Sequence, residues 1–211
     1  MANLLYVKAN PKVTEQSISL RLGERFVSAF REFHPNHTVT TLDVYADNVP
    51  LLDADVFNGW GKLAKASELS YGEQTKVKRL GELVEQFIAA DVVVFALPMW
   101  NFGFPPMLKA YMDAVAVAGK TFQYTATGPQ GLLQGKKAVI LEARGGFYGD
   151  SEDGTPNPLN HSAAHLRVFL NFLGITDIQV VAAEGLSVDP SQAESILEAA
   201  AGQAGEIAKQ I

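Results

Sequence analysis

The sequence predicts a doubly wound α/β fold, in which one five-stranded parallel sheet is covered by helices on both faces. Five short apolar or β-branched segments alternate with amphipathic helical segments, and such alternation favours right-handed crossovers onto one parallel sheet. The segment 92–98 is apolar without interruption, and 137–143 is apolar over most of its length, as in strands that are buried on both faces. Neither a linker nor a repeat breaks the pattern, so we expect residues 1–211 to form one domain.

The elements of the first half follow in order. "NLLYVKAN" at 3–10 predicts the first strand, and apolar residues spaced by four and three predict a helix over 18–33. "TVTTLDVY" at 38–45 is rich in β-branched residues and predicts the second strand. Two helical segments are expected next, a weakly periodic one over 56–69 and a clearly amphipathic one over 77–88.

The second half begins with the apolar strand at 92–98. A helix is expected to begin at Pro105-Pro106, because proline suits the first turn of a helix. "KAVILEA" at 137–143 predicts the fourth strand, and a helix over 161–173 is expected to stop at Gly174, the usual residue after a helix end. "DIQVVAAEG", from residue 177, predicts the fifth strand.

The last helix has the clearest start signal in the chain. Asp189 lies in the cap position, Pro190 in the first turn, and Gln192 has the spacing of a capping-box partner. We therefore expect a helix from this point to Ile211, with an apolar stripe turned toward the sheet.

Composition excludes several classes of function. A net charge of -6 without a cluster of Lys or Arg argues against nucleic acid or an anionic membrane as a partner. The apolar run 92–100 is too short to span a bilayer and "MANLLYVKAN" lacks the features of a signal peptide, so we predict a cytoplasmic protein. The chain has no cysteine, and His161 and His165 lack a third ligand, so we predict no metal site.

The fold predicts where a ligand binds. In doubly wound sheets, ligands lie beyond the carboxyl ends of the strands, at the point where the strand order reverses. This rule selects three loops in this chain: 9–19, 98–106 and 144–160.

The first loop, "ANPKVTEQSIS", has no glycine fingerprint, so it does not predict a dinucleotide pyrophosphate site. A single phosphate is an option, because Ser17 and Ser19 lie where the first helix starts and where free N–H groups and the helix dipole attract anions. The alternative is that Ser17 or Thr14 simply caps the helix.

The other two loops suit a planar ring. Trp100 and Phe102 offer aromatic walls, and Asn101 offers hydrogen bonds. Residues 144–146, Arg-Gly-Gly, offer backbone N–H groups that can approach a ligand closely. The alternatives are a small hydrophobic cluster or subunit interface in the second loop and an ordinary turn in the third. A phosphate site beside a planar-ring site fits flavin mononucleotide (FMN).

Three blocks of sequence carry a resemblance that runs from end to end. "LPMWNFGFPPMLKAYMD", "GKTFQYTATGPQGLL" and "EARGGFYGD", in this order and spacing, closely resemble the FMN-dependent NADH-azoreductase family, which has the flavodoxin-like fold. The resemblance implies a homodimer that binds FMN tightly and reduces quinones and azo compounds. It also implies ping-pong hydride transfer, with NADH or NADPH as the hydride donor and the flavin, not a catalytic side chain, carrying the chemistry.

The resemblance also implies a set of site residues. It places the FMN phosphate on Asn10, Ser17, Ile18 and Ser19. It places the ring against Pro98, Met99, Trp100, Asn101 and Phe102, with Ala143, Arg144, Gly145 and Gly146 completing the pocket. Tyr124 and Phe169 are predicted to face the substrate.

The main alternative is a flavodoxin-like carrier that binds FMN and shuttles single electrons without a substrate of its own. Two aromatic and helical insertions, at 56–69 and 122–133, favour the enzyme, because they suit dimerisation and enclosure of a substrate. A third interpretation is an interaction domain without a cofactor, which would be colourless.

Overall fold

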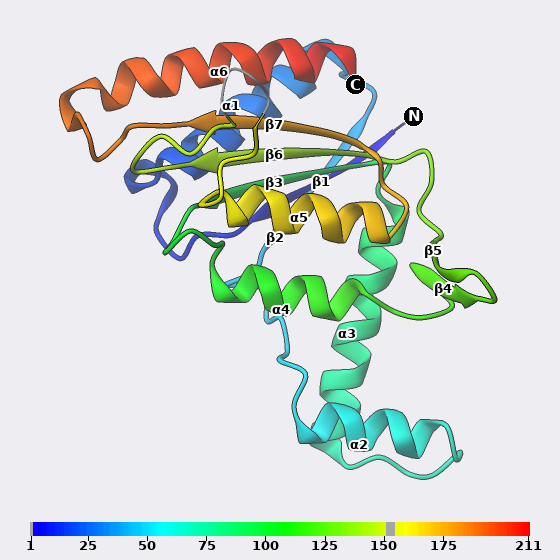
Figure 1. Ribbon diagram of the computed structural model, residues 1–211. Helices are drawn as coiled ribbons and strands as arrows, with labels where there is room; N and C mark the ends of the chain where they lie inside the picture. Colours follow the sequence, from blue (N-terminus) through cyan, green and yellow to red (C-terminus); the bar gives the residue numbers. More distant parts are fainter. Residues whose placement is uncertain (1, 151–154) are drawn as a thin grey trace.

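The computed structural model describes residues 2–150 and 155–211. Within them, one parallel sheet has the strand order β2-β1-β3-β6-β7, which confirms the predicted fold (Figure 1). The order reverses between β1 and β3, so the loops after these two strands flank the switch point. Residues 151–154 of the predicted third loop lie outside the described residues. The strands are β1 (Asn3–Lys8), β2 (Thr38–Asp43), β3 (Val92–Pro98), β6 (Lys137–Ala143) and β7 (Asp177–Ala183).

Helices cover both faces of the sheet and create two cores (Figure 1). Along β3, Val93 and Phe95 enter one core, whereas Val94 and Ala96 enter the other. This double burial explains why the strand is apolar at every position. None of the helices in the described part of the chain is long and apolar enough to cross a membrane. One face carries α1 (Ile18–Phe33) and α6 (Ala193–Gln210), and the other carries α3 (Tyr71–Ala89), α4 (Pro106–Val115) and α5 (His161–Phe172).

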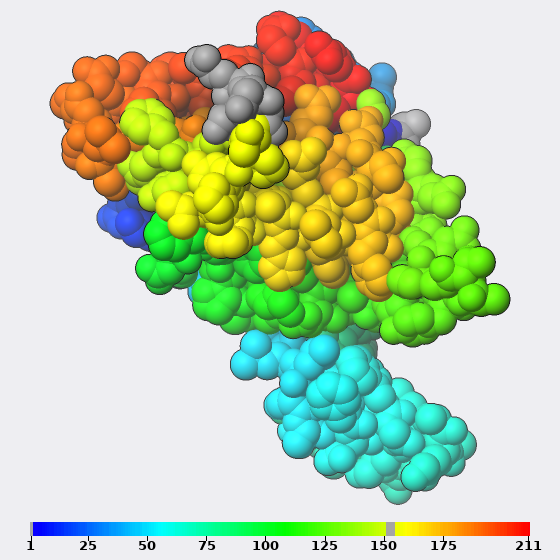
Figure 2. All heavy atoms as spheres, in the orientation of Figure 1, coloured from blue at the N-terminus to red at the C-terminus, as the bar shows by residue number. Residues whose placement is uncertain are grey.

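An arm formed by α2 (Ala54–Leu63) and the start of α3 projects from the body of the molecule (Figure 2). Gly59 allows the two helices to approach, since a Cβ there would lie 2.8 Å from Val77 Cγ2. The expected helix over 56–69 is shorter in the structure, because the chain turns after Leu63 and Ala66 takes a left-handed conformation with φ 51°.

The segment 122–133 contains a hairpin over 122–131, so the expectation of a helical insertion there is wrong. β4 (Phe122–Thr125) pairs with β5 (Gly128–Gly131) in antiparallel register. Gly128 closes the turn with φ 121°, a conformation open to glycine. Gly131 packs on Gly174 so closely that any side chain would clash with its backbone. The hairpin therefore docks at the end of α5, at the opposite end of the sheet from the carboxyl ends of the strands (Figure 1).

The start of the last helix also differs from expectation. Asp189 accepts hydrogen bonds from the backbone N and the Oγ of Ser191, at 3.1 and 2.6 Å. Its carboxylate thus caps a 3-10 turn, η2 (Pro190–Gln192), and α6 begins only at Ala193. The predicted capping box does not form, because Ser191 takes the carboxylate and the Gln192 side chain accepts from Ser195 Oγ instead.

Candidate functional site

A cavity of about 270 Å³ opens at the carboxyl ends of the strands, where the sequence places a ligand. It gathers ten of the predicted site residues: Asn10, Ser17, Ile18, Ser19, Pro98, Met99, Trp100, Ala143, Arg144 and Gly145. Sequence reasoning missed four lining residues: Lys12, Gln16, Leu186 and Ser187. The first two lie inside the predicted first loop. The other two follow β7, so the rule on strand ends, applied to the fifth strand, finds them.

The first loop forms a cradle of side-chain donors. Asn10 Nδ2 donates to Ser17 Oγ at 2.8 Å and to Ser19 Oγ at 3.4 Å, and all three side chains are buried. Ser17 Oγ also accepts from Leu20 N at 3.2 Å, so Ser17 both caps α1 and lines the cavity. Ser17 Oγ and Ser19 Oγ also lie 3.1 Å apart, so one hydroxyl donates to the other and the second keeps its proton for a ligand. Such hydroxyls at a helix N-terminus suit an anion.

Thr14 does not cap α1. It begins a separate 3-10 turn, η1 (Thr14–Gln16), whose end leads into the extended residue Ser17. The first-turn N–H groups of Ile18 and Ser19 have no acceptor within the described residues. They therefore remain available to a ligand in the cavity.

The second loop is a tight turn that presents its aromatic residues to solvent. Trp100 N donates to Gly103 O at 2.8 Å and Gly103 N donates to Trp100 O at 2.9 Å. Between them, Asn101 and Phe102 both lie in the left-handed region, with φ 49° and 67°. Met99 N anchors the turn to Ala143 O at 2.8 Å. This geometry keeps Trp100 and Phe102 at 38% and 42% exposure, although both are large apolar side chains.

The third loop pairs with the loop after β7. Ser187 N donates to Gly145 O at 2.8 Å, and Gly185 N donates to Gly146 O at 3.0 Å. A Cβ on Gly145 would lie 2.8 Å from Ser187 Oγ, which explains the need for glycine at this position. The N–H groups of Gly145 and Gly146 have no acceptor in the part of the chain that the structure describes.

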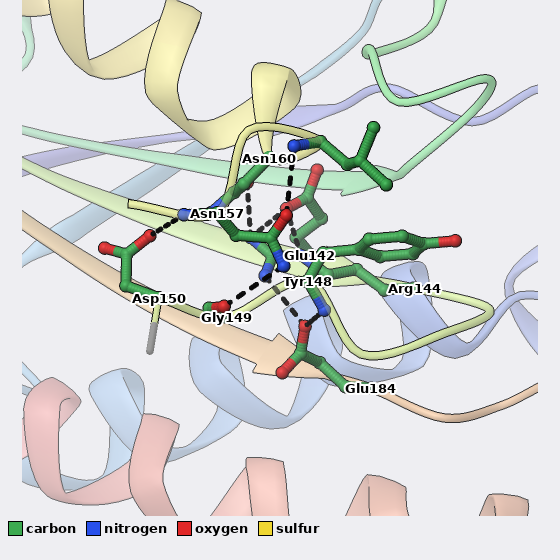
Figure 3. Close-up of polar contacts among 9 residues, drawn as sticks. Glu142, Arg144, Tyr148, Gly149, Asp150, Asn157, Asn160 and Glu184 are labelled. Atoms are coloured by element: carbon green, nitrogen blue, oxygen red, sulfur yellow. Dashed lines mark hydrogen bonds and ion pairs between the residues drawn. The ribbon is translucent and has the colours of Figure 1, made fainter. Parts of the chain in front are cut away.

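The Arg144 guanidinium is held by hydrogen bonds and ion pairs to other residues of the chain (Figure 3). It bonds Glu142 Oε2 at 2.6 Å, Glu184 Oε1 at 2.9 Å and Asn160 Oδ1 at 3.1 Å, and it is almost fully buried. Burial raises the pKa of Glu142, and the neighbouring Arg144 charge opposes this shift. The Arg144 side chain thus connects β6 to the end of β7 and the start of α5, beside the cavity that Arg144 lines.

A larger cavity, of about 500 Å³, lies along α5 and the edge strand β7. Residues such as Asn160, Arg167 and Val180 line it. Of the predicted site residues only Arg144 reaches it. The smaller cavity is therefore the candidate site, because it collects the donors and the aromatic turn in one place.

Five predicted residues do not line the candidate cavity. Asn101, Phe102 and Gly146 lie beside it, in the same turns as lining residues. Phe169 on α5 packs against the core formed with α3 and α4. Tyr124 is 77% exposed on the hairpin, at the opposite end of the sheet. Within one chain, neither Phe169 nor Tyr124 is brought to the cavity.

The two histidines considered as metal ligands lie at the start of α5. His165 packs its ring against Phe104, with centroids 5.2 Å apart. Among the residues that the structure describes, no group of three His, Asp or Glu side chains is placed to hold a metal ion.

Comparison with known proteins identifies the family. A family model described as flavodoxin-like fold matches residues 2–208. The chain is 43% identical to "FMN-dependent NADH:quinone oxidoreductase 2" of Bacillus subtilis, over 99% of both chains. It is 34% identical to the FMN-dependent NADH-azoreductase of Bacillus anthracis, whose structure was solved in complex with FMN, with a TM-score of 0.91 over 100% and 99% of the chains. The chain belongs to the family of FMN-dependent NADH:quinone oxidoreductases and azoreductases.

Membership of this oxidoreductase family confirms the resemblance drawn from the three sequence blocks. A further member, "FMN-dependent NADH:quinone oxidoreductase 3" of Halalkalibacterium halodurans, is 47% identical over 99% of both chains. All three relatives are named as enzymes, which favours the predicted oxidoreductase over a carrier of single electrons.

Proposed function

We propose that this protein is an FMN-dependent NAD(P)H oxidoreductase that reduces quinones and azo compounds, with NADH as the favoured hydride donor. The observation that carries the proposal is the cavity itself, in which an anion cradle and an aromatic turn meet at the switch point of the sheet. The names of the relatives support the same assignment of cofactor, donor and acceptor.

The residues present fit FMN. Asn10, Ser17 and Ser19 would hold the phosphate together with the N–H groups at the start of α1, with Asn10 Nδ2 positioning the two serine hydroxyls. Trp100 and the following turn would wall the ring, since aromatic faces suit a planar heterocycle.

The chemistry that FMN supplies when bound is two-electron transfer from NAD(P)H to the acceptor. The chain's part is to bind, orient and stabilise charge. The free N–H groups of Asn101, Gly145 and Gly146 are the proposed donors to the nitrogen and carbonyl edge of the ring. No side chain of the cavity is required as a general acid or base.

We propose that the enzyme is a homodimer. The arm projects from the body of the molecule (Figure 2). It exposes large apolar side chains, including Phe57 at 61% and Tyr71 at 86% exposure, which a second copy would cover. In a dimer, Tyr124 and Phe169 of one copy would contact the substrate in the cavity of the other copy.

We propose a single domain over residues 1–211, located in the cytoplasm, whose partners are small molecules rather than nucleic acid or a membrane. The single sheet and the net charge of -6 support them.

The test is the visible spectrum of the full chain after incubation with FMN and desalting, followed by anaerobic addition of NADH and then of a quinone or an azo dye. We expect retained yellow flavin that bleaches with NADH and recovers with either acceptor. Ser19→Ala should lower flavin retention, because Ser19 is buried in the cradle. Ser28→Ala, an exposed position on the same helix, is the matched control.

Other outcomes are equally decisive. Protein that retains no flavin would contradict the proposed function and leave the cofactor-free interpretation. Flavin that NADH cannot bleach directly, but that a partner protein reduces, would instead support the one-electron carrier.

A further inference from the structure

Lys12 stands out among the residues that line the candidate cavity. Only Lys12 and Arg144 of the lining residues carry a charge. The Arg144 guanidinium is neutralised by Glu142 and Glu184. The Lys12 ammonium has no acidic partner within the described residues. It is therefore the uncommitted positive charge of this cavity.

The loop geometry holds Lys12 beside the donor cradle. Lys12 N donates to Asn10 Oδ1 at 3.1 Å, while the same amide group of Asn10 donates through Nδ2 to Ser17 and Ser19. One side chain thus fixes both the backbone of Lys12 and the two hydroxyls. Lys12 itself is exposed at the rim, where a lysine stem is free to reach a ligand.

The other donors of the cradle do not select for charge as strongly. Asn10, Ser17 and Ser19 are neutral, and neutral donors serve a hydroxyl as well as a phosphate. The start of α1 contributes only a partial positive charge. A phosphate carries between one and two negative charges near neutral pH, so a full counter-charge distinguishes it from a hydroxyl.

We propose that Lys12 is the residue that makes this site prefer a phosphorylated flavin to the same flavin without its phosphate. The proposal rests on the proposed function, because it assigns Lys12 to the phosphate of the FMN bound there. Lys12 acts by electrostatic attraction at the rim, in addition to the hydrogen bonds of the buried cradle.

The test compares FMN with riboflavin, which differ by the phosphate alone. Dissociation constants of the flavin-free full chain are measured by quenching of flavin fluorescence, at low and at high ionic strength. Lys12→Gln should weaken FMN binding by about 1.5-fold to fivefold at low salt, the range expected for an exposed charge pair. It should leave riboflavin binding unchanged, and Lys12→Arg should retain the preference for FMN.

Two comparisons make the result specific. Lys78→Gln removes the same charge from α3, away from the cavity, and should leave both affinities unchanged. High salt should bring wild type and Lys12→Gln together, because the ions screen an exposed ammonium.

The outcomes separate the two proposals. If Lys12→Gln weakens FMN and riboflavin equally, or weakens neither, the assignment of Lys12 is overturned while FMN binding by the wild type still supports the function. If the wild type binds neither flavin, the proposed function fails, and the assignment of Lys12 fails with it.

Discussion

At the scale of single residues, Phe102 has a strained backbone conformation in the turn beside the candidate site. Its φ of 67° lies in the left-handed region, which costs a non-glycine residue about 1–2 kcal/mol. The flanking pair of hydrogen bonds between Trp100 and Gly103 enforces this conformation. The ring gains an edge-to-face contact with Tyr148, at a centroid distance of 5.9 Å. Such strain is typical of functional turns.

This strain predicts an unusual order of stability at position 102. Phe102→Ala and Phe102→Gly both remove the ring, but only glycine adopts the left-handed conformation without cost. We therefore expect the glycine variant to have the larger free energy of unfolding, by about 1 kcal/mol. Urea denaturation of the flavin-free protein measures the difference. Equal stabilities would mean that the turn relaxes when the ring is removed.

At the scale of elements, an ion pair between Lys62 and Glu73 joins the two helices of the arm, α2 and α3. Glu73 completes a capping box with Ser70 at the start of α3, and its carboxylate accepts from Lys62 of α2 at 2.7 Å. The bond from Lys62 lowers the pKa of Glu73, with the Ser70 backbone N–H adding to the effect. The folded state therefore favours the charged form of Glu73.

The sign of this shift predicts how the arm responds to pH. Glu73 contributes stability above its unfolded pKa of about 4.3, and the contribution is lost as the pH falls through the lower folded pKa. The melting temperature of Glu73→Gln should lie below that of the wild type at pH 7, and the gap should close in acid. Glu68→Gln, an exposed acid just before α3, is the control. A gap that persists unchanged at acidic pH would show that the charge of Glu73 is not responsible.

At the scale of the whole molecule, the apolar surface of the arm leads to a prediction about dimerisation. Phe57 is 61% exposed on α2 and packs edge-to-face with Trp60, at 5.7 Å between centroids. If a second copy covers this surface, a charge placed there must be buried in the interface. Phe57→Glu should therefore shift the protein from dimer to monomer in light scattering at micromolar concentration.

Phe33 provides the matched control for this experiment. It is also an exposed phenylalanine, at 45%, but it lies at the end of α1, away from the arm. Phe33→Glu should leave the oligomeric state unchanged. A wild-type protein that is monomeric at high concentration would contradict the proposed dimer directly.

The sequence by itself determined the layered architecture and the position of the site. Uninterrupted apolar strands such as β3 are a local signal with one physical cause, burial on both faces. Once five parallel strands are assigned, the loops at their carboxyl ends follow without knowledge of any contact. The rule on strand ends predicted Ser17 and Ser19 for this reason, whereas Asn10 came from the family resemblance.

Only the tertiary structure decided which groups in those loops are free. Arg144 reads from sequence as a cation at the site, but Glu142 and Glu184 neutralise it from two different strand ends. Lys12 was overlooked in the sequence, and it is the charge that remains uncommitted. The hairpin at 122–131 was likewise hidden, because its place depends on the contact between Gly131 and Gly174, 43 residues apart in the chain. Local patterns fix which segments are buried, whereas charge pairing and docking depend on residues that meet only after folding.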